Sequence, residues 1–330
     1  MASTKQERLR RFYERFDGSD QVLILINADP DAIASAMAVK RLLWRKVAGI
    51  TIAHVNVIQR PDNLTMVRLL GVNMVHIDEI GEASFTKFAL VDSQPCHHEH
   101  FQKYRFDVVI DHHPDTSPDA GYKDIRPRYG ATASMMTEYL RAARIKPSGK
   151  LAAGLFYAIK TDTSDFERET QNEDLAAFQF LFRHANIPLA RRIEQADLKM
   201  EFLKYFRRAI ENRRFRKGWI FAHLGSVGNP DVLVLIADFF LRIDTVHWTI
   251  ISGVYQRKLV VIMRNDGIRK NAGKVAKEGF GALGSAGGHP SMARAEIPMA
   301  KLSGTVDNRD PKKILNWIID RIQRRAGEAR

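Results

Sequence analysis

The sequence predicts an α/β protein with two domains. Short runs rich in valine, isoleucine and leucine alternate with amphipathic helical segments, which is typical of a parallel sheet covered by helices. Several of these runs end abruptly in carboxylates or imidazoles, and open α/β sheets carry their chemistry at such strand ends. With 330 residues, the chain is long for one domain and sufficient for two cores.

The composition, 45% hydrophobic and 27% charged, is that of a soluble globular protein. No apolar run approaches the roughly 20 residues that a membrane span needs, and the charged start, residues 1–15, has no apolar segment or cleavage signal for export. The single cysteine, Cys96, excludes an intramolecular disulfide and fits a reducing compartment. The formal charge of +13 favours a phosphorylated ligand. We therefore expect a cytoplasmic protein with no membrane partner.

The first predicted strand, residues 21–27, is followed by Asp29 and Asp31 and then by a helix over residues 32–47. Both aspartates lie on a strand-to-helix turn, so they can face one side and share a metal site. Helix capping is the alternative, since aspartate is favoured in the first turn of a helix. Capping needs only one aspartate, so the second favours a ligand role.

Two later strands also end in polar groups, after a strand at 50–57, a helix at 62–70 and a short strand at 73–77. Residues 87–91 lead into Asp92. Residues 108–110 lead into Asp111, His112 and His113. Because the ends of parallel strands lie side by side, these groups are expected to converge on one rim. Carboxylate and imidazole together suit a divalent ion such as Mn²⁺.

Further candidates lie beside these strands. The segment Cys96-His97-His98-Glu99-His100 is rich in ligand types, but adjacent positions rarely bind one ion, so an exposed helix start is the preferred interpretation. Thr132 and Ser134 begin a predicted helix that runs to about residue 145, where they can cap it or bind a phosphate. An apolar helix over residues 150–159 runs into Thr161-Asp162-Thr163, which makes Asp162 one more candidate ligand.

The second half of the chain reads as another α/β unit. Residues 172–217 are predicted to be helical, and the charged part from 191 leads between two domains. Strands are predicted at 219–224, 247–254 and 258–263. The glycine-rich segment 279–290 can bring backbone amides close to a phosphate, or it can be a flexible surface loop. His289 and four basic residues favour phosphate binding: Arg264, Arg269, Lys270 and Lys274.

Together these landmarks resemble the DHH/DHHA1 phosphoesterases, the superfamily of the RecJ exonuclease, the nanoRNase/pAp phosphatases and the cyclic-di-AMP phosphodiesterases. The matching motifs are Asp29-Pro30-Asp31, Asp92, Asp111-His112-His113, Thr161-Asp162-Thr163 and Gly287-Gly288-His289-Pro290. They occur in the family's order and span nearly the whole chain. The combination is specific, although no single motif is.

The resemblance implies a metal-dependent hydrolase that cleaves phosphodiester or phosphomonoester bonds of short nucleotides. The expected substrates are nanoRNA oligonucleotides, pAp, or linear and cyclic dinucleotides. It implies a catalytic, metal-binding DHH domain with a parallel sheet over residues 1–190, a helical linker over 191–216, and a smaller substrate-binding DHHA1 domain over 217–330, with a cleft between the domains. A homodimer is in keeping with the family.

The resemblance also implies two Mn²⁺ ions, with Mg²⁺ or another divalent ion as the alternative. Asp29 would bind the first ion, and Asp92 would bridge the two. The ligands of the second ion would be Asp31, His112 and Asp162. The catalytic residues would be Asp92, Asp111, His112 and His113. The substrate would be held by His113, Arg264, Gly287, Gly288 and His289.

The sequence departs from the family pattern at Leu25, where a histidine normally binds the first ion. Either water fills this position, or His97, His98 or His100 replaces the ligand, or one ion binds weakly. A nucleotide-binding regulatory protein with weakened catalysis is therefore the alternative function. Hydrolysis of polyphosphate or pyrophosphate is a third possibility, which Arg264 and His289 disfavour. The glycine segment also departs from the pattern, at Ala286 and at residues 292–294.

Overall fold

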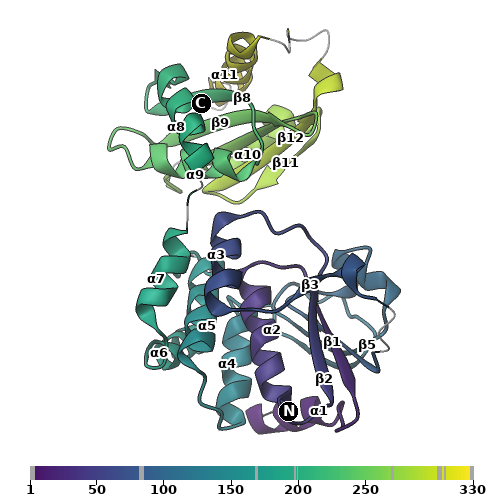
Figure 1. The fold of residues 1–330 in the computed structure, drawn as a ribbon. Helices are drawn as coiled ribbons and strands as arrows, with labels where there is room; N and C mark the ends of the chain where they lie inside the picture. Colours follow the sequence, from purple (N-terminus) through teal and green to yellow (C-terminus); the bar gives the residue numbers. More distant parts are fainter. Residues whose placement is uncertain are drawn as a thin grey trace. The chain divides into compact units, whose positions relative to one another are not determined.

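A six-stranded parallel sheet forms the centre of the first of two units (Figure 1). The computed structural model describes residues 4–81, 85–167, 170–196, 198, 200–268, 271–302, 307 and 310–327. The first unit comprises residues 1–197 and the second residues 198–330. The α/β fold class predicted from the sequence is confirmed.

The strand order of the first sheet is β3-β2-β1-β4-β5-β6. Its strands are β1 (Gln21–Ile26), β2 (Gly49–His54), β3 (Val75–His76), β4 (Lys87–Val91), β5 (Phe106–Asp111) and β6 (Ala120–Ile125). From β1 the chain proceeds outward through β2 and β3, and it then returns to β4 on the other side of β1. The connections after β1 and β4 therefore diverge, and such a switch point leaves room for a site at the carboxyl ends of the two strands.

Helices cover the sheet of the first unit. They are α1 (Lys5–Tyr13), α2 (Pro30–Leu43), α3 (Pro61–Leu70), α4 (Thr132–Ala142), α5 (Gly149–Asp162), α6 (Asn172–Phe182) and α7 (Ile187–Gln195). Alternate residues of β1 serve the two faces of the sheet, as strand geometry requires. Ile24 and Ile26 join the core that includes α2, α4 and α5, whereas Leu23 and Leu25 join a smaller apolar cluster with Phe101.

The second unit contains a mixed sheet in the order β11-β12-β10-β9-β8-β7. Its strands are β7 (Arg214–Arg216), β8 (Trp219–Ser226), β9 (Trp248–Tyr255), β10 (Lys258–Asn265), β11 (Ser285–Gly288) and β12 (Met292–Pro298). Its helices are α8 (Leu203–Asn212), α9 (Asp231–Leu241), α10 (Ala272–Phe280) and α11 (Pro311–Gly327). Only β8 and β9 pair in parallel among the strands described in this unit. Separate apolar clusters pack on the two faces.

Some segments differ from their predictions. Residues 285–288, predicted as part of a glycine-rich loop, form the edge strand β11, because they pair with residues 293–296 of β12. The predicted linker, residues 191–216, is divided: its start belongs to α7 in the first unit, and α8 and β7 pack on β8 in the second. Strands β6 and β12 and helices α10 and α11 were not predicted, and β7 forms a strand at the end of the segment 172–217, which was predicted to be helical. Its residues pair with β8. None of the helices that the structure describes combines the length and apolar character needed to cross a membrane.

The glycines of the second unit allow a close approach between α10 and β11. A side-chain carbon at Gly273 would lie 2.3 Å from the carbonyl oxygen of Gly288. Gly288 itself has φ +149°, and a side-chain carbon there would lie 2.2 Å from the oxygen of Met292. Backbone packing therefore accounts for both glycines without a ligand.

Substitution of Gly273 by alanine is expected to destabilise the protein. The added carbon meets backbone that cannot move aside freely, and overpacking of this kind costs about 1–3 kcal/mol. Gly279→Ala in the same helix is the matched control, because nothing lies within 4 Å of the new carbon. That control should be neutral or raise the free energy of unfolding by up to about 1 kcal/mol. Urea denaturation checks both values, and equal effects of the two substitutions would contradict the packing argument.

Candidate metal centre

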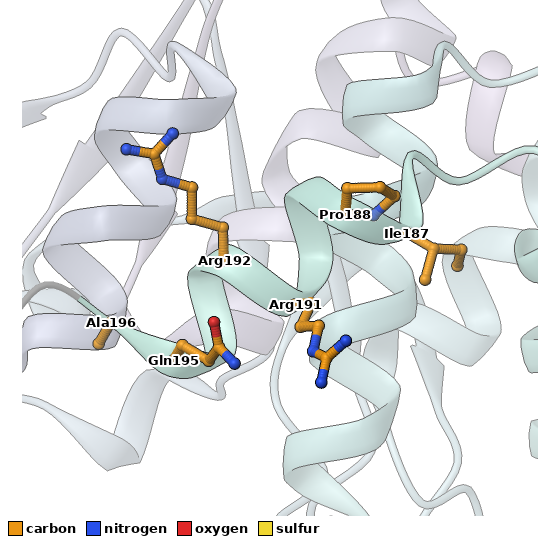
Figure 2. A pocket seen from close by; sticks show the side chains of 6 residues that line it. All are labelled: Ile187, Pro188, Arg191, Arg192, Gln195 and Ala196. Atoms are coloured by element: carbon orange, nitrogen blue, oxygen red, sulfur yellow. The ribbon is translucent and has the colours of Figure 1, made fainter.

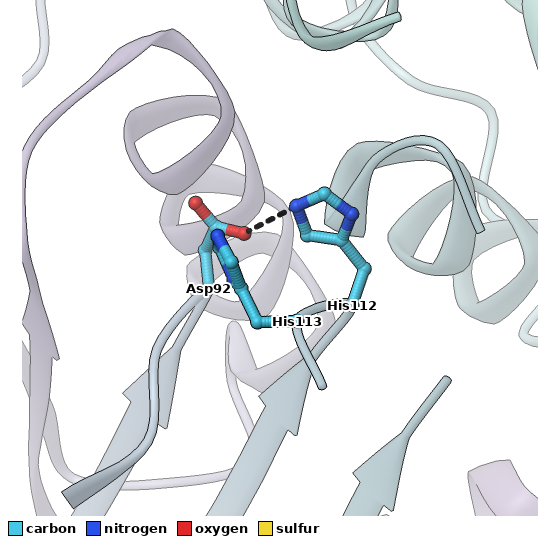
Figure 3. Close-up of side chains that lie close together, drawn as sticks. All are labelled: Asp92, His112 and His113. Atoms are coloured by element: carbon cyan, nitrogen blue, oxygen red, sulfur yellow. Dashed lines mark ion pairs between the residues drawn. The ribbon is translucent and has the colours of Figure 1, made fainter. Parts of the chain in front are cut away.

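Four side chains from separate segments meet beyond the carboxyl ends of β1, β4 and β5. They are Asp31 in the first turn of α2, Asp92 after β4, His112 after β5 and Asp162 at the end of α5. Nε2 of His112 lies 3.1 Å from Oδ2 of Asp162 and 3.6 Å from Oδ1 of Asp92. Figure 3 shows Asp92 facing the two imidazoles that follow β5. The convergence expected from the strand ends is therefore present.

Donor atoms in this cluster lie close enough to share an ion. One atom each from Asp31, His112 and Asp162 lie within 4.8 Å of one another, and the same holds for Asp92, His112 and His113 (Figure 3). Both sets combine carboxylate with imidazole, the donor chemistry of Mn²⁺ and similar ions. The ligand set that the sequence predicted for the second ion is thus one of these groups.

Asp31 is fully buried and is held by the start of α4. Its two carboxylate oxygens accept backbone N–H groups of Thr132, at 2.6 Å, and of Ala133, at 2.7 Å. The hydroxyl of Ser35 adds a hydrogen bond of 3.2 Å. A helix amino end stabilises negative charge, and each carboxylate oxygen retains a further lone pair that can bind a cation. Asp31 is therefore prepared for an anionic, ligand-binding state.

Asp29 has a different local role. Its carboxylate caps α2 by accepting the backbone N–H of Ala32 at 2.9 Å. This is the capping alternative considered for the Asp29-Pro30-Asp31 motif, and it applies to Asp29 but not to Asp31. In the described part of the chain, Asp29 belongs to no group of three donor atoms within 4.8 Å of one another. A role for Asp29 with the first ion remains a prediction.

Asp92 has a backbone conformation that its neighbours impose. Its φ is +59°, a region that is unfavourable for residues other than glycine, and its backbone N–H donates to the carbonyl of Ile110 at 2.8 Å. The hydroxyl of Thr132 donates to Oδ1 at 2.8 Å. The carboxylate is therefore directed to one position, close to His112, at the cost of local strain.

When its ring is neutral, His112 presents a nitrogen lone pair toward these carboxylates. Its Nδ1 lies 3.1 Å from the carbonyl oxygen of Tyr129, which can only accept, so the hydrogen resides on Nδ1. Nε2 is buried and, among the described residues, makes no hydrogen bond of good geometry, despite its proximity to Asp162. A buried lone pair beside carboxylates, with the second ring nitrogen fixed by a carbonyl, is the arrangement of a metal-binding histidine. The residues present therefore fit a divalent cation.

The electrostatics of the cluster lead to the same conclusion. Burial and the Asp162 charge raise the pKa of Asp29 to about 6 and that of Asp31 to about 8. Burial and the charges of the other aspartates also raise the pKa of Asp92 well above its ordinary value. Burial opposes protonation of His112, but the nearby carboxylates outweigh it and raise its pKa to about 9. A bound cation would relieve the repulsion that keeps these carboxyl groups protonated.

Asp111 and His113 form a pair beside the cluster. Nδ1 of His113 donates to Oδ1 of Asp111 at 2.8 Å, and the amide nitrogen of Gln94 donates to Oδ2 at 2.6 Å. Burial raises the pKa of Asp111, but these hydrogen bonds outweigh it and the net pKa is lowered. The hydrogen bond to Asp111 raises the pKa of His113. The His113 side chain is 46% exposed, so it can meet a ligand.

Leu25 is a core residue. It is fully buried in an apolar cluster, and its neighbours on the adjacent strands are Ala53 and Leu90. Of the three histidines considered as substitutes, His98 and His100 stack on each other, with ring centroids 5.2 Å apart, and His100 faces Asp78. Only His97 lies near the site, where it shares a donor group with Asp111 and His113.

The predicted substrate residues of the second unit lie around one end of its sheet. Arg264 of β10 is paired in register with Met292 and forms an ion pair with Asp238 at 2.9 Å. The exposed His289 follows β11, and its carbonyl accepts the N–H of Gly273. The amides at the start of α10 are thus satisfied internally, and Arg269 and Lys270 lie outside the described residues. Phosphate binding here remains a prediction.

A pocket with a volume of about 530 Å³ lies along α7 of the first unit (Figure 2). Its lining residues are Ile187, Pro188, Arg191, Arg192, Gln195 and Ala196. None of them is a predicted site residue. The pocket therefore makes no contribution to the candidate metal centre.

Sequence reasoning missed residues that orient the ligands. Thr132 was considered only for capping or phosphate binding, yet it contacts both Asp31 and Asp92. Gln94 and the carbonyl of Tyr129 were assigned no role, although they fix Asp111 and His112. The sequence offered only a weak signal for Gln94, a polar residue two positions after Asp92 at the end of a predicted strand.

Removal of divalent cations is expected to make the stability of the protein fall as the pH rises. The raised pKa values of Asp29 and Asp31, about 6 and about 8 against an ordinary 3.8, mean that the folded state binds more protons than the unfolded state in that window. The stabilisation of the folded state that comes from protonated His112 is complete below about pH 6.5 and is lost as the pH rises past about 9. The free energy of unfolding in EDTA should therefore be lower at about pH 8.5 than at about pH 6.

Divalent cations should oppose this trend, because they bind the deprotonated ligands. Stabilisation by Mn²⁺ should be larger at the higher pH. Asp31→Asn should reduce the pH dependence measured in EDTA. Urea denaturation at the two pH values provides the measurement, and a pH dependence that neither Mn²⁺ nor the variant alters would rule out the cluster as its origin.

Comparison with known proteins places this arrangement in a family. Residues 21–159 match the DHH family, N-terminal domain. The uncharacterized protein MJ1633 of Methanocaldococcus jannaschii is 34% identical over 299 residues, which cover 90% of this chain and 62% of that protein, so the chain spans less than two thirds of the relative's length. The crystal structure of an exopolyphosphatase-related protein from Bacteroides fragilis is similar in fold, with a TM-score of 0.67 and 16% identity over 88% of this chain and 91% of that one. The first unit of this chain is therefore similar, over residues 21–159, to the N-terminal domain of the DHH family.

Proposed function

We propose that the protein is a metal-dependent phosphoesterase that hydrolyses short nucleotides. The observation that carries this proposal is the group of largely buried carboxylates, Asp31, Asp92 and Asp162, around Nε2 of His112. Such a group is electrostatically unfavourable without a cation, and its ligand types suit Mn²⁺ or a similar ion. Similarity to the DHH family supports the same class of reaction.

The residues that would hold one ion are Asp31, His112 and Asp162. Asp92 and Asp29 would hold the other ion. Divalent cations held there would supply the Lewis acidity that lowers the pKa of a water and stabilises charge on phosphoryl oxygens. The protein's own contribution is to fix the ligands: the start of α4 holds Asp31, Thr132 holds Asp92, and the Tyr129 carbonyl holds His112.

His113 is the residue we assign to the substrate. It is partly exposed beside Asp92 and His112, and Asp111 fixes its ring by a hydrogen bond to Nδ1. This leaves Nε2 to contact a phosphate oxygen or to carry a proton to the leaving oxygen. The raised pKa of His113 favours the protonated form that both roles need.

The second unit is proposed as the substrate-binding, DHHA1-type domain. Arg264 and His289 lie near the same end of its sheet, because Arg264 pairs with Met292 and His289 donates to the carbonyl of Met292. A net charge of +13 also favours anionic substrates. Suitable substrates are pAp, nanoRNA oligonucleotides, and linear or cyclic dinucleotides. Polyphosphate and pyrophosphate belong in the same assay, because one protein of similar fold is named exopolyphosphatase-related.

A second candidate function is nucleotide binding without turnover. It is favoured by Leu25, which is fully buried among apolar side chains and cannot bind an ion. A centre that lacks one ligand would bind the first ion weakly, while the remaining groups still hold a nucleotide. Its signature would be nucleotide binding with less than one tightly held ion and no turnover of any substrate.

Asp92→Ala is expected to abolish turnover. Its carboxylate is the proposed bridge between the ions, so the rate with Mn²⁺ should fall by a factor on the order of 10³. Product release is measured from a panel of pAp, pApA, di- to pentanucleotides, cyclic dinucleotides, polyphosphate and pyrophosphate, and metal content is determined on the same samples.

Asp119→Ala is the matched control, since this carboxylate is exposed and belongs to no donor group among the described residues. It should retain wild-type turnover. Undiminished turnover by Asp92→Ala would refute the proposed mechanism. Absence of turnover in the wild type, with nucleotide still bound, would favour the second candidate.

Leu25→His is expected to destabilise the protein without adding a metal equivalent. The imidazole would enter an apolar cluster and lack a hydrogen-bond partner, which costs about 1–3 kcal/mol. Leu25→Met conserves volume and should cost less than about 1.5 kcal/mol. Urea denaturation and Mn²⁺ titration provide the measurements. A gain of one bound ion together with activity would instead show that position 25 faces the centre and that the wild type lacks a ligand there.

A further inference from the structure

Gln94 connects the two histidines beside the candidate metal centre. Its side chain is completely buried, and it lies between the strand ends that carry Asp92 and Asp111. The amide oxygen accepts the backbone N–H of Thr116 at 2.8 Å and its hydroxyl at 2.6 Å. A backbone N–H can only donate, so this contact fixes which end of the Gln94 amide carries the oxygen.

The direction of the hydrogen bonds follows from that contact. The amide nitrogen of Gln94 must donate, and it does so to Oδ2 of Asp111 at 2.6 Å and to the carbonyl of Pro114 at 3.0 Å. Asp111 therefore accepts on both oxygens, and His113 donates to it through Nδ1. When His113 is neutral, its Nε2 carries a lone pair.

Gln94 also contacts His97, but here the imidazole accepts a hydrogen bond, whereas that of His113 donates one. The backbone N–H of Gln94 donates to Nδ1 of His97 at 3.1 Å, and the hydroxyl of Ser93 lies 3.2 Å from the same nitrogen. Nδ1 is therefore an acceptor without a hydrogen, so the neutral ring carries its hydrogen on Nε2. Within the described part of the chain, Nε2 of His97 has no hydrogen-bond partner.

The ring of His97 lies beside the site. Its ring meets that of His113 edge to face, with centroids 5.5 Å apart and an interplanar angle of 77°. One donor atom each of His97, Asp111 and His113 lie within 4.8 Å of one another. Proximity alone would allow a metal ligand here. Ligation through Nε2 would, however, move the hydrogen to Nδ1, where it would oppose the Gln94 N–H.

We propose that His97 binds an anionic oxygen of the substrate phosphate through its Nε2–H group, and that it is not the ligand that replaces the histidine missing at position 25. This inference rests on the proposed phosphoesterase function, because it assumes that the phosphate is bound next to His113. His97 is thus proposed as a binding residue, supplied by the short segment after Asp92.

The test compares His97→Ala with His97→Gln and with the control His98→Ala. Glutamine keeps an amide N–H donor, and His98 is a neighbouring histidine whose ring stacks on His100. Three quantities are measured for each purified protein: the Mn²⁺ stoichiometry by titration calorimetry, the Kd for AMP in the presence of Mn²⁺, and kcat and KM for the substrate that the wild type turns over.

His97→Ala should keep the wild-type Mn²⁺ stoichiometry, while Kd and KM rise roughly 10- to 100-fold, because a hydrogen bond to a charged group is lost. His97→Gln should recover part of the loss, and His98→Ala should match the wild type. A lost Mn²⁺ equivalent in His97→Ala would overturn the proposal by making His97 a ligand. Unchanged Kd and KM in His97→Ala would overturn it as well.

The outcomes separate this proposal from the proposed function. If the wild type neither binds AMP nor turns over any substrate, the proposed function fails, and this inference fails with it. If the wild type is active and Asp92→Ala is inactive, the proposed function stands whatever the His97 variants show. Should His97→Ala unfold, the Kd of folded His97→Gln decides the question. A raised Kd supports the proposal, whereas a purely structural role would leave the Kd unchanged.

Discussion

The burial of several carboxylates at one edge of a parallel sheet is the constraint on which the rest of the first unit depends. Asp31 and Asp92 are almost completely inaccessible, and Asp162 lies nearby on α5. Charges of one sign in such a place require compensation, either from protons, from fixed dipoles or from a cation. The fold supplies part of this compensation through the start of α4 and through His112. The remainder matches what divalent ions provide.

Sheet topology explains why these groups come together. β1 and β4 are neighbours whose connections leave in opposite directions, so the residues after them come together at the switch point of the sheet. β5 lies next to β4 and brings His112 and His113 to the same edge. The second unit has a different, mixed sheet, and its glycines serve close backbone packing between α10 and β11.

The sequence carried strong signals for some of this and weak signals for the rest. The ends of β1, β4 and β5 could be predicted because apolar runs stop abruptly at charged residues. β6 could not, because the segment Ala120–Ile125 contains few large apolar residues and a glycine. Pairing with β12 turned a glycine-rich segment into an edge strand, and only tertiary structure reveals such a partner. Which ring nitrogen of His97 carries the hydrogen depends on one backbone N–H group, that of Gln94, which no residue pattern specifies.

Thr132 contacts two carboxylates through different atoms. Its backbone N–H holds Asp31 and its hydroxyl holds Asp92. Both contacts sit on the first residue of a helix that is buried from Thr132 to Leu140. The spacing between the two carboxylates therefore depends on the position of α4 in the core, because a rotation or slide of that helix would alter both contacts. Changes in packing far from the centre thus have a direct route to the separation of its ligands.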